Sequence, residues 1–206
     1  MSTILLDFDG VVINNPKINE YITHKSIQFI QKKYNKSYAK AKVINKNFYT
    51  NHGHTAIGID SQDYKQNIMD YNEYVFSKMD YNDVMNMMTI MDAMQIQQLN
   101  QYSFKFGLFT NAPKEWCENI LMFANMDMYD VFDEEMCFSS NDGLIKPKKE
   151  IYDFVETKLD DVDVIHFIDD NKMNFKEIIT NQKWSTHWLQ NTRYSNLHTY
   201  LYRNLR

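Results

Sequence analysis

The chain has 206 residues, a formal net charge of -5, 44% hydrophobic residues and 24% charged residues, an ordinary balance for a globular protein. This length accommodates one core domain with a modest insert and excludes two full enzyme domains. The two cysteines, Cys117 and Cys137, are too few for a disulfide framework and are expected to be reduced thiols. The acidic balance excludes a surface built to grip long nucleic acid.

Short apolar runs predict buried strands, and helical patterns follow them. The runs are at residues 3–8 (TILLDF), 104–110 (FKFGLFT) and 162–168 (VDVIHFI), with a shorter one at 185–189. Helical spacing follows at 113–124, 148–158 and 171–180, and a last helix is expected at about 193–204. Strands that alternate with helices predict an α/β fold: a doubly wound, mostly parallel sheet with a Rossmann-like core.

The block at 16–101 breaks this alternation. It has long helical stretches at 18–34, 64–79 and 81–100, and it has no strong strand pattern. We therefore expect a helical cap at 16–101, inserted between the first and second strands of a core formed by 1–15 and 102–206.

Polar residues follow the strands at four places. These are Asp7-Phe8-Asp9-Gly10, Thr110-Asn111-Ala112, Lys146-Pro147-Lys148 and Asp169-Asp170-Asn171, with Asn174 four residues after Asp170. Each alone has an ordinary explanation as a turn, a helix cap or a loop. Together, in this order, they indicate one site, because ligands of open α/β sheets bind beyond the carboxyl ends of the strands.

The acidic residues of this set favour a metal and displacement at phosphorus. Asp7, Asp169 and Asp170 would bring up to three carboxylates together, and their repulsion calls for a hard cation such as Mg²⁺. Asp7 can attack a phosphoryl group to form an aspartyl-phosphate. Asp9 can protonate the leaving alkoxide and then deprotonate the hydrolytic water.

The remaining residues suit the phosphoryl oxygens. The Thr110 hydroxyl, the Asn111 backbone N–H and the Lys146 ammonium can each donate a hydrogen bond to them. The sequence therefore predicts a phosphoryl-binding site that works mainly by placement and charge neutralisation.

These motifs resemble those of the haloacid dehalogenase-like (HAD) hydrolase superfamily. The resemblance lies in DFDG at 7–10, Thr110 at a strand end, Lys146 and the Asp169-Asp170 pair, and it covers almost the whole chain. The position of the insert, between the first two motifs, resembles the type I helical cap.

The resemblance implies residue roles. Asp7 would be the nucleophile and Asp9 the acid/base. Mg²⁺ would be held by the Asp7 and Asp170 carboxylates and the Asp9 backbone carbonyl, with Asp169 supporting the metal shell or orienting a water. The phosphoryl group would be bound by Thr110, Asn111 and Lys146. An acid/base Asp at position 9 is typical of members that act on phosphate esters rather than on carbon–halogen bonds.

A narrower similarity concerns the pyrimidine 5'-nucleotidase-like branch. It rests on Tyr49-x3-Gly53-x-Thr55-x2-Gly58, on 109–112 (FTNA) and on 167–171 (FIDDN) with Asn174. It implies a nucleoside monophosphate substrate, although that branch usually has Asp-Asn-Thr where this chain has Asp9-Gly10-Val11. Sugar phosphates, phosphoglycolate and a phosphomutase reaction stay as alternatives, as does a non-catalytic scaffold. Residues 51–55 (NHGHT) are either an exposed loop or a substrate loop.

The expected surroundings are those of a metabolic enzyme. The first residues show no signal-peptide pattern, and no apolar run approaches the roughly 18 residues of a membrane helix. We expect a cytoplasmic monomer or homodimer with a small phosphorylated metabolite as its partner, and with neither membrane nor long nucleic acid as partners.

Overall fold

The computed structural model describes residues 2–59, 62–77, 80–190 and 197–204. Its centre is a sheet of parallel strands in the order β3-β2-β1-β4-β5. The strands are β1 (Ser2–Leu6), β2 (Phe106–Phe109), β3 (Phe132–Phe138), β4 (Val164–Asp169) and β5 (Trp184–Trp188). This confirms the predicted α/β class with its doubly wound parallel sheet.

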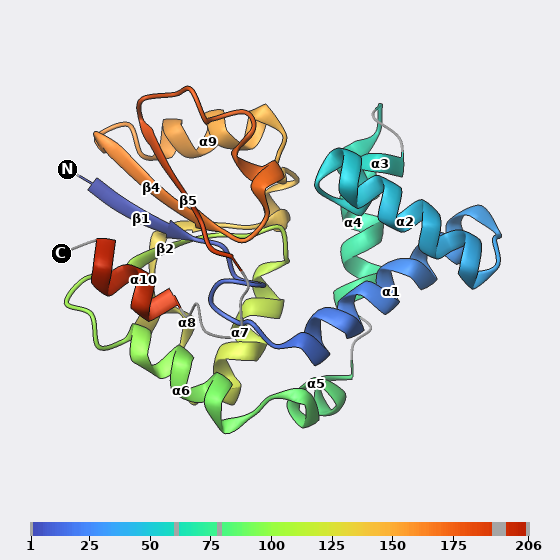
Figure 1. The fold of residues 1–206 in the computed structure, drawn as a ribbon, viewed down its shortest axis with the longest axis horizontal. Coiled ribbons are helices and arrows are strands. Elements are labelled where there is room, and N and C mark those ends of the chain that lie inside the picture. Colours follow the sequence, from blue (N-terminus) through green and yellow to red (C-terminus); the bar gives the residue numbers. More distant parts are fainter. Residues whose placement is uncertain (1, 60–61, 78–79, 191–196, 205–206) are drawn as a thin grey trace.

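Helices cover both faces of the sheet (Figure 1). One face carries α9 (Lys149–Lys158), and the other carries α7 (Lys114–Phe123), α8 (Met128–Val131), α6 (Ile90–Leu99) and α10 (Leu197–Asn204). Successive strand residues point to opposite faces. Leu5 therefore packs with the Phe167 and α9 cluster, while Leu6 packs with α7 and α8.

A second group of helices projects from one side of the core (Figure 1). It consists of α1 (Pro16–Tyr34), α2 (Tyr38–His52), α3 (Thr55–Ile59), α4 (Tyr64–Asn72), the π-helical turn η1 (Glu73–Ser77) and α5 (Tyr81–Met87). Its first helix begins cleanly because the Asn15 side chain accepts hydrogen bonds from the backbone N–H groups of Lys17 and Ile18. Among the described residues, no helix is long and apolar enough to cross a membrane.

The helix α6 lies within the predicted cap range but hydrogen-bonds to the core. The Gln97 side chain donates to the Ala124 carbonyl at the end of α7 (2.9 Å), and His198 of α10 donates to the Gln95 carbonyl (2.9 Å). The cap boundary at residue 101 remains a prediction.

Several local elements differ from the sequence-based expectation. The helical stretch expected at 81–100 is divided into α5 and α6. Residues 132–138 form β3, which was not predicted because its middle is polar and partly exposed, as befits a strand at the sheet edge. The helix predicted at 171–180 was wrong, because a short 3-10 helix, η3 (Lys172–Phe175), stands there and is followed by turns. The Asn174 carbonyl accepts a hydrogen bond from the Tyr152 hydroxyl, and Asn174 Nδ2 donates one to Asp169 Oδ2. These two bonds fix the segment to the core. The last helix is described at Leu197–Asn204, and residues 193–196 of the predicted range lie outside the described residues.

Candidate active site

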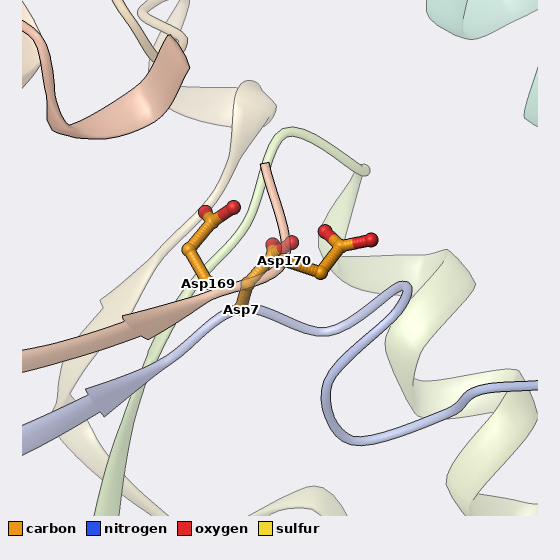
Figure 2. A group of neighbouring side chains, drawn as sticks. All are labelled: Asp7, Asp169 and Asp170. Atoms are coloured by element: carbon orange, nitrogen blue, oxygen red, sulfur yellow. The ribbon is translucent and has the colours of Figure 1, made fainter. Parts of the chain in front are cut away.

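The site lies at the carboxyl ends of the central strand β1 and its neighbour β4. Asp7 follows β1 directly, and its backbone N–H donates to the Ile168 carbonyl of β4 (2.9 Å). Asp169 ends β4, and Asp170 follows it. Figure 2 shows the three side chains gathered beyond the strand ends, and they can place one carboxylate oxygen each within 4.8 Å of one another. Residues about 160 positions apart thus meet as the sequence predicted.

Lys146 balances part of this negative charge. It is fully buried, and its Nζ donates to Asp7 Oδ1 (2.9 Å), Asp169 Oδ2 (2.7 Å) and the Phe109 carbonyl (2.6 Å). Burial alone would lower the Lys146 pKa, but the Asp169 and Asp7 carboxylates outweigh it and raise that pKa, so the ammonium is charged.

Burial also raises the pKa of Asp7 well above its usual range. Lys146 opposes this rise, whereas Asp169 and Asp170 add to it by repulsion. Three carboxyl groups stand beside one ammonium, so their full ionisation would leave negative charge that Lys146 cannot neutralise. Carboxylate oxygens in such excess are the ligands that a hard divalent cation prefers.

Asp169 differs from the other two acids in its surroundings. It is fully buried, and its oxygens accept hydrogen bonds from Lys146 Nζ, from the Asn171 backbone N–H (2.7 Å) and from Asn174 Nδ2 (2.8 Å). These bonds orient Asp169 below the cavity floor, while Asp7 and Asp170 face the cavity.

The loop after β1 turns sharply to bring Asp9 back over the site. Gly10 has φ +96°, and a Cβ there would lie 2.4 Å from Asp170 Oδ2, so only glycine fits. The backbone N–H groups of Val11, Val12 and Ile13 all donate to the Phe8 carbonyl, which holds the turn.

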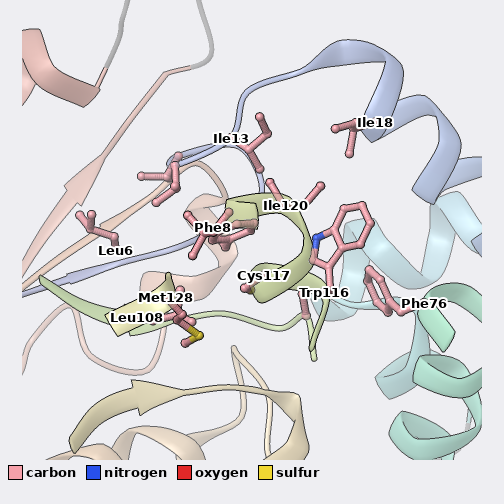
Figure 3. Packing of buried hydrophobic residues seen from close by; sticks show 14 of the residues in the cluster. Leu6, Phe8, Ile13, Ile18, Phe76, Leu108, Trp116, Cys117, Ile120 and Met128 are labelled. Atoms are coloured by element: carbon pink, nitrogen blue, oxygen red, sulfur yellow. The ribbon is translucent and has the colours of Figure 1, made fainter. Parts of the chain in front are cut away.

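Asp9 accepts a hydrogen bond from Trp116, a residue that the sequence did not single out. The Trp116 indole N–H faces both Asp9 carboxylate oxygens, at 3.1 and 3.2 Å. The pKa of Asp9 is raised to about 7, mainly by burial and also by the Asp170 charge, while the indole hydrogen bond and Lys146 oppose the rise. Trp116 packs at the start of α7 beside Ile120 and Phe76 (Figure 3), so in the sequence it is indistinguishable from an ordinary core residue.

The side chains of Thr110 and Asn111 have different hydrogen-bond partners beside the cavity. Thr110 Oγ1 accepts a hydrogen bond from the Ala112 N–H (3.1 Å), which leaves its own proton free to donate. The Asn111 side chain exchanges hydrogen bonds with the Lys146 backbone, at 2.9 Å to the carbonyl and 2.8 Å from the N–H. Its side chain therefore positions the Lys146 backbone, and its backbone N–H is the group proposed to meet a ligand.

These residues border a cavity of about 350 Å³ between the core and a second wall formed by α1, α2, residues 53–54, α4 and η1. The core side is formed by Asp7, Asp9, Thr110, Asn111, Lys146 and Asp170. All the predicted site residues except Asp169 thus line one cavity, and Asp169 lies directly beneath it.

Residues 51–55 are not simply an exposed loop. Asn51 and His52 are exposed, but Gly53, His54 and Thr55 are buried, and Gly53 and His54 line the cavity. The segment contacts the core: Asn171 Nδ2 donates to the Gly53 carbonyl (3.4 Å) and to the Tyr49 hydroxyl (3.3 Å). The sequence left both interpretations open, and the cavity position favours the substrate loop.

Comparisons with known proteins identify the fold. No protein-family model and no curated protein sequence matches this chain. Solved structures do match over its whole length. A predicted HAD-like family hydrolase from Porphyromonas gingivalis has 14% identity and a TM-score of 0.56, with 100% of this chain and 98% of that chain covered. A HAD phosphatase from Thermococcus onnurineus has 14% identity and a TM-score of 0.54, with 100% and 97% covered.

A HAD family enzyme from Bacteroides thetaiotaomicron is similar at 16% identity and a TM-score of 0.51, with 97% and 98% covered. The chain therefore has the fold of the HAD-like hydrolases, as the sequence motifs predicted. Within that fold, its acidic cluster and buried lysine occupy the end of the sheet where ligands of such sheets bind.

Proposed function

We propose that this protein is a Mg²⁺-dependent phosphatase that hydrolyses a small phosphomonoester through an aspartyl-phosphate on Asp7. One observation carries the proposal: Asp7, Asp169 and Asp170 converge at the strand ends, beside one buried ammonium and under a cavity. The matched folds of a HAD phosphatase and of HAD-like hydrolases support it.

The donor set fits Mg²⁺. The Asp7 and Asp170 carboxylates and the Asp9 backbone carbonyl would hold it, and the well-bonded Asp169 would support the set from below. The bound metal would neutralise charge on the phosphoryl oxygens and so admit an anion to an acidic site.

In the first step, Asp7 is the nucleophile. One carboxylate oxygen forms a bond to phosphorus, the ester P–O bond breaks, and its electron pair goes to the leaving oxygen. Lys146 holds the other Asp7 oxygen at 2.9 Å and so fixes the direction of attack. The Thr110 hydroxyl and the Asn111 N–H are the proposed donors to the phosphoryl oxygens. The three N–H groups of Lys146 already donate to Asp7, Asp169 and the Phe109 carbonyl, so Lys146 would bind the phosphoryl group through its charge.

Asp9 serves both steps as the acid and then the base. Its pKa of about 7 allows both protonation states near neutral pH. Protonated Asp9 gives its proton to the departing alkoxide. The resulting carboxylate then takes a proton from water as the water oxygen bonds to phosphorus, the Asp7–phosphorus bond breaks, and inorganic phosphate leaves.

The cap side of the cavity would choose the leaving group. The segment at 53–55 and the similarity at 49–58 support a nucleoside monophosphate as substrate, as in 5'-nucleotidases. Sugar phosphates and phosphoglycolate are the alternative esters, and a phosphomutase is the alternative reaction. The proposed setting is the cytoplasm, with the protein as a monomer or homodimer.

Turnover of p-nitrophenyl phosphate tests the proposal. We expect release of p-nitrophenol that needs Mg²⁺ and is abolished in Asp7→Asn. Wild-type turnover no greater than that of Asp7→Asn, across a broad pH range, would indicate a non-catalytic scaffold. Formation of an isomer from a hexose 1-phosphate, without net phosphate release, would indicate a mutase.

A further inference from the structure

The cavity wall supplied by the cap carries no ionised side chain among the described residues. Its polar and aromatic members are Asn19, Thr23, Tyr49, His54, Tyr71 and Phe76. A leaving group attached to a phosphoryl group at Asp7 must lie against this wall, because the core side of the cavity is occupied by the acidic cluster.

The histidine of this wall is held neutral. His54 is buried, its Nδ1 accepts a hydrogen bond from the Ala56 N–H (3.2 Å), and Nε2 is therefore the protonated ring nitrogen. Burial lowers the pKa of His54 to about 4. Its ring meets the Tyr71 ring edge-on, with centroids 4.8 Å apart. Because the His54 ring is neutral, it supplies no cation to the cavity.

Tyr71 is likewise neutral and fixed. Ser26 Oγ donates to the Ile22 carbonyl (2.8 Å), so the Tyr71 hydroxyl must donate to Ser26 Oγ (2.6 Å). Burial raises the pKa of Tyr71 to about 12. Together with Tyr49 and Phe76, these rings offer flat, uncharged surfaces.

The described cavity-lining residues also lack a spare cation. Lys146 is the one Lys or Arg among them, and its ammonium already pairs with Asp7 and Asp169. Every arginine of the chain lies at or beyond position 193, so residues 1–192 contain no guanidinium that could grip a second phosphate or a carboxylate.

On the basis of the proposed phosphatase function, we propose that the cavity selects monoesters whose leaving alcohol is uncharged and has a flat apolar face. A second anionic group would be buried without a partner and near the carboxylates of Asp7, Asp9 and Asp170, which is costly. This specificity disfavours phosphoglycolate and bisphosphates. It favours an ester of an uncharged alcohol that carries an aromatic ring, such as a nucleoside monophosphate.

The cavity size agrees with this substrate class. Its volume of about 350 Å³ is near the lower end of the roughly 300–1,000 Å³ of small-molecule sites. Such a volume admits one compact group beside the phosphoryl group and favours a ring-bearing alcohol over an extended chain.

A matched pair of esters tests the selection. Phenyl phosphate and 4-carboxyphenyl phosphate share a ring and differ by one carboxylate, which does not make the phenolate a poorer leaving group. We expect kcat/KM with Mg²⁺ to be at least about tenfold higher for phenyl phosphate, which corresponds to about 1.4 kcal/mol.

A charge-introducing variant tests whether the wall causes the difference. Thr23 of α1 is exposed at the cavity edge, so Thr23→Lys places an ammonium there without a change in the core. We expect the phenyl to carboxyphenyl ratio to fall about tenfold in Thr23→Lys. Thr157→Lys, the same substitution at an exposed position of α9 away from the cavity, should keep the wild-type ratio.

The outcomes separate the two proposals. Hydrolysis of both esters with equal kcat/KM, or a ratio that Thr23→Lys leaves unchanged, overturns the specificity and leaves the phosphatase function standing. Hydrolysis of neither ester overturns the phosphatase function and the specificity with it.

Discussion

Lys146 is the residue on which the charge balance of the site depends. Its ammonium is completely buried and contacts two carboxylates and a carbonyl. Removal of one partner from a buried ionic cluster leaves charge uncompensated, which costs more than the loss of an exposed pair.

We therefore expect Lys146→Met to lower the free energy of unfolding by roughly 3 kcal/mol and turnover by about 10²-fold or more. Urea unfolding measures the first effect, and phosphate release by the folded variant measures the second. The control is Lys149→Met, which removes an exposed ion pair with Asp153 and should have little measurable effect. Equal destabilisation by the two variants would show that Lys146 does not balance the cluster.

His54 makes stability depend on pH. Its folded-state pKa is about 4, against an ordinary value of 6.5, because the buried ring resists protonation. The unfolded chain therefore binds more protons between these values, and the His54 contribution is fully present above pH 6.5 and is lost as the pH falls toward 4. The loss amounts to about 3 kcal/mol.

The variant His54→Gln should remove this part of the pH dependence. Between pH 6.5 and pH 4, we expect the unfolding free energy of the wild type to fall by about 3 kcal/mol more than that of His54→Gln. Urea titrations at several pH values measure it. His52→Gln, at an exposed position two residues earlier, should run parallel to the wild type. If His54→Gln also runs parallel, the ring is not held neutral by burial.

The loop after β1 is the element that sets the distance between Asp9 and Asp170. Gly10 has a positive φ and lies against the Asp170 carboxylate, whereas Gly143 has a positive φ of 68° with nothing within 4 Å of its Cβ position. A side chain at either glycine would add backbone strain, because both have a positive φ. Only at Gly10 would its Cβ also collide with another residue, Asp170.

This pair makes a controlled experiment on the metal site. We expect Gly10→Ala to weaken Mg²⁺ binding about tenfold or more, because the new methyl group must displace Asp170, and Gly143→Ala to leave the affinity unchanged. Calorimetric titration of Mg²⁺ measures both. Equal affinities in the two variants would mean that Asp170 is not a ligand or that the loop yields freely.

The helix α7 carries the indole that orients Asp9. Trp116→Phe keeps a ring against Phe76 and removes the N–H that faces both carboxylate oxygens. A hydrogen bond to a charged group contributes roughly 1.5–3 kcal/mol, so loss of orientation should slow hydrolysis of an alkyl phosphate about tenfold or more.

The leaving group distinguishes this effect from general damage. p-Nitrophenolate departs without a proton, so Trp116→Phe should change p-nitrophenyl phosphate turnover much less than alkyl phosphate turnover. The control is Trp184→Phe, which removes an indole hydrogen bond to Glu156 on the far side of the sheet and should affect both substrates alike. An equal loss for both substrates in Trp116→Phe would argue against a role in proton transfer.

At the scale of the whole molecule, the sequence predicted the catalytic edge better than the cavity above it. Asp7, Thr110 and Asp170 could be placed because each follows an apolar strand, and parallel strands bring their carboxyl ends together. Lys146 lies in a loop, and only the order of the motifs pointed to it.

The cap side could not be predicted in this way. Asn19, Thr23 and Tyr71 lie on the helices α1 and α4. The sequence does not show which face of these helices borders the cavity, because that depends on how they pack on the core. Trp116 is similarly hidden, because an indole on an apolar helix face indicates core packing whether or not its N–H faces a carboxylate. The edge strand β3 was not predicted, because a strand at the sheet edge is partly exposed and contains polar residues. It therefore lacks the continuous apolar run by which the inner strands were predicted.

The structure joins cap and core directly over the site. Asn171, next to the acidic pair, bonds the Tyr49 hydroxyl and the Gly53 carbonyl, and Asn72 Nδ2 donates to Ser140 Oγ (2.7 Å). In the proposed mechanism these hydrogen bonds would hold the helices α1 to α4 over Asp7 while the substrate is bound.

The most direct test of the account is to trap the phosphoryl group on Asp7. The protein is mixed with Mg²⁺ and p-nitrophenyl phosphate, quenched in acid within one turnover, digested, and analysed by mass spectrometry. We expect one added phosphoryl group on the peptide that contains Asp7, dependent on Mg²⁺ and absent from Asp7→Asn. Steady phosphate release by a wild-type protein that carries the phosphoryl group on another residue, or by an active Asp7→Asn variant, would contradict it.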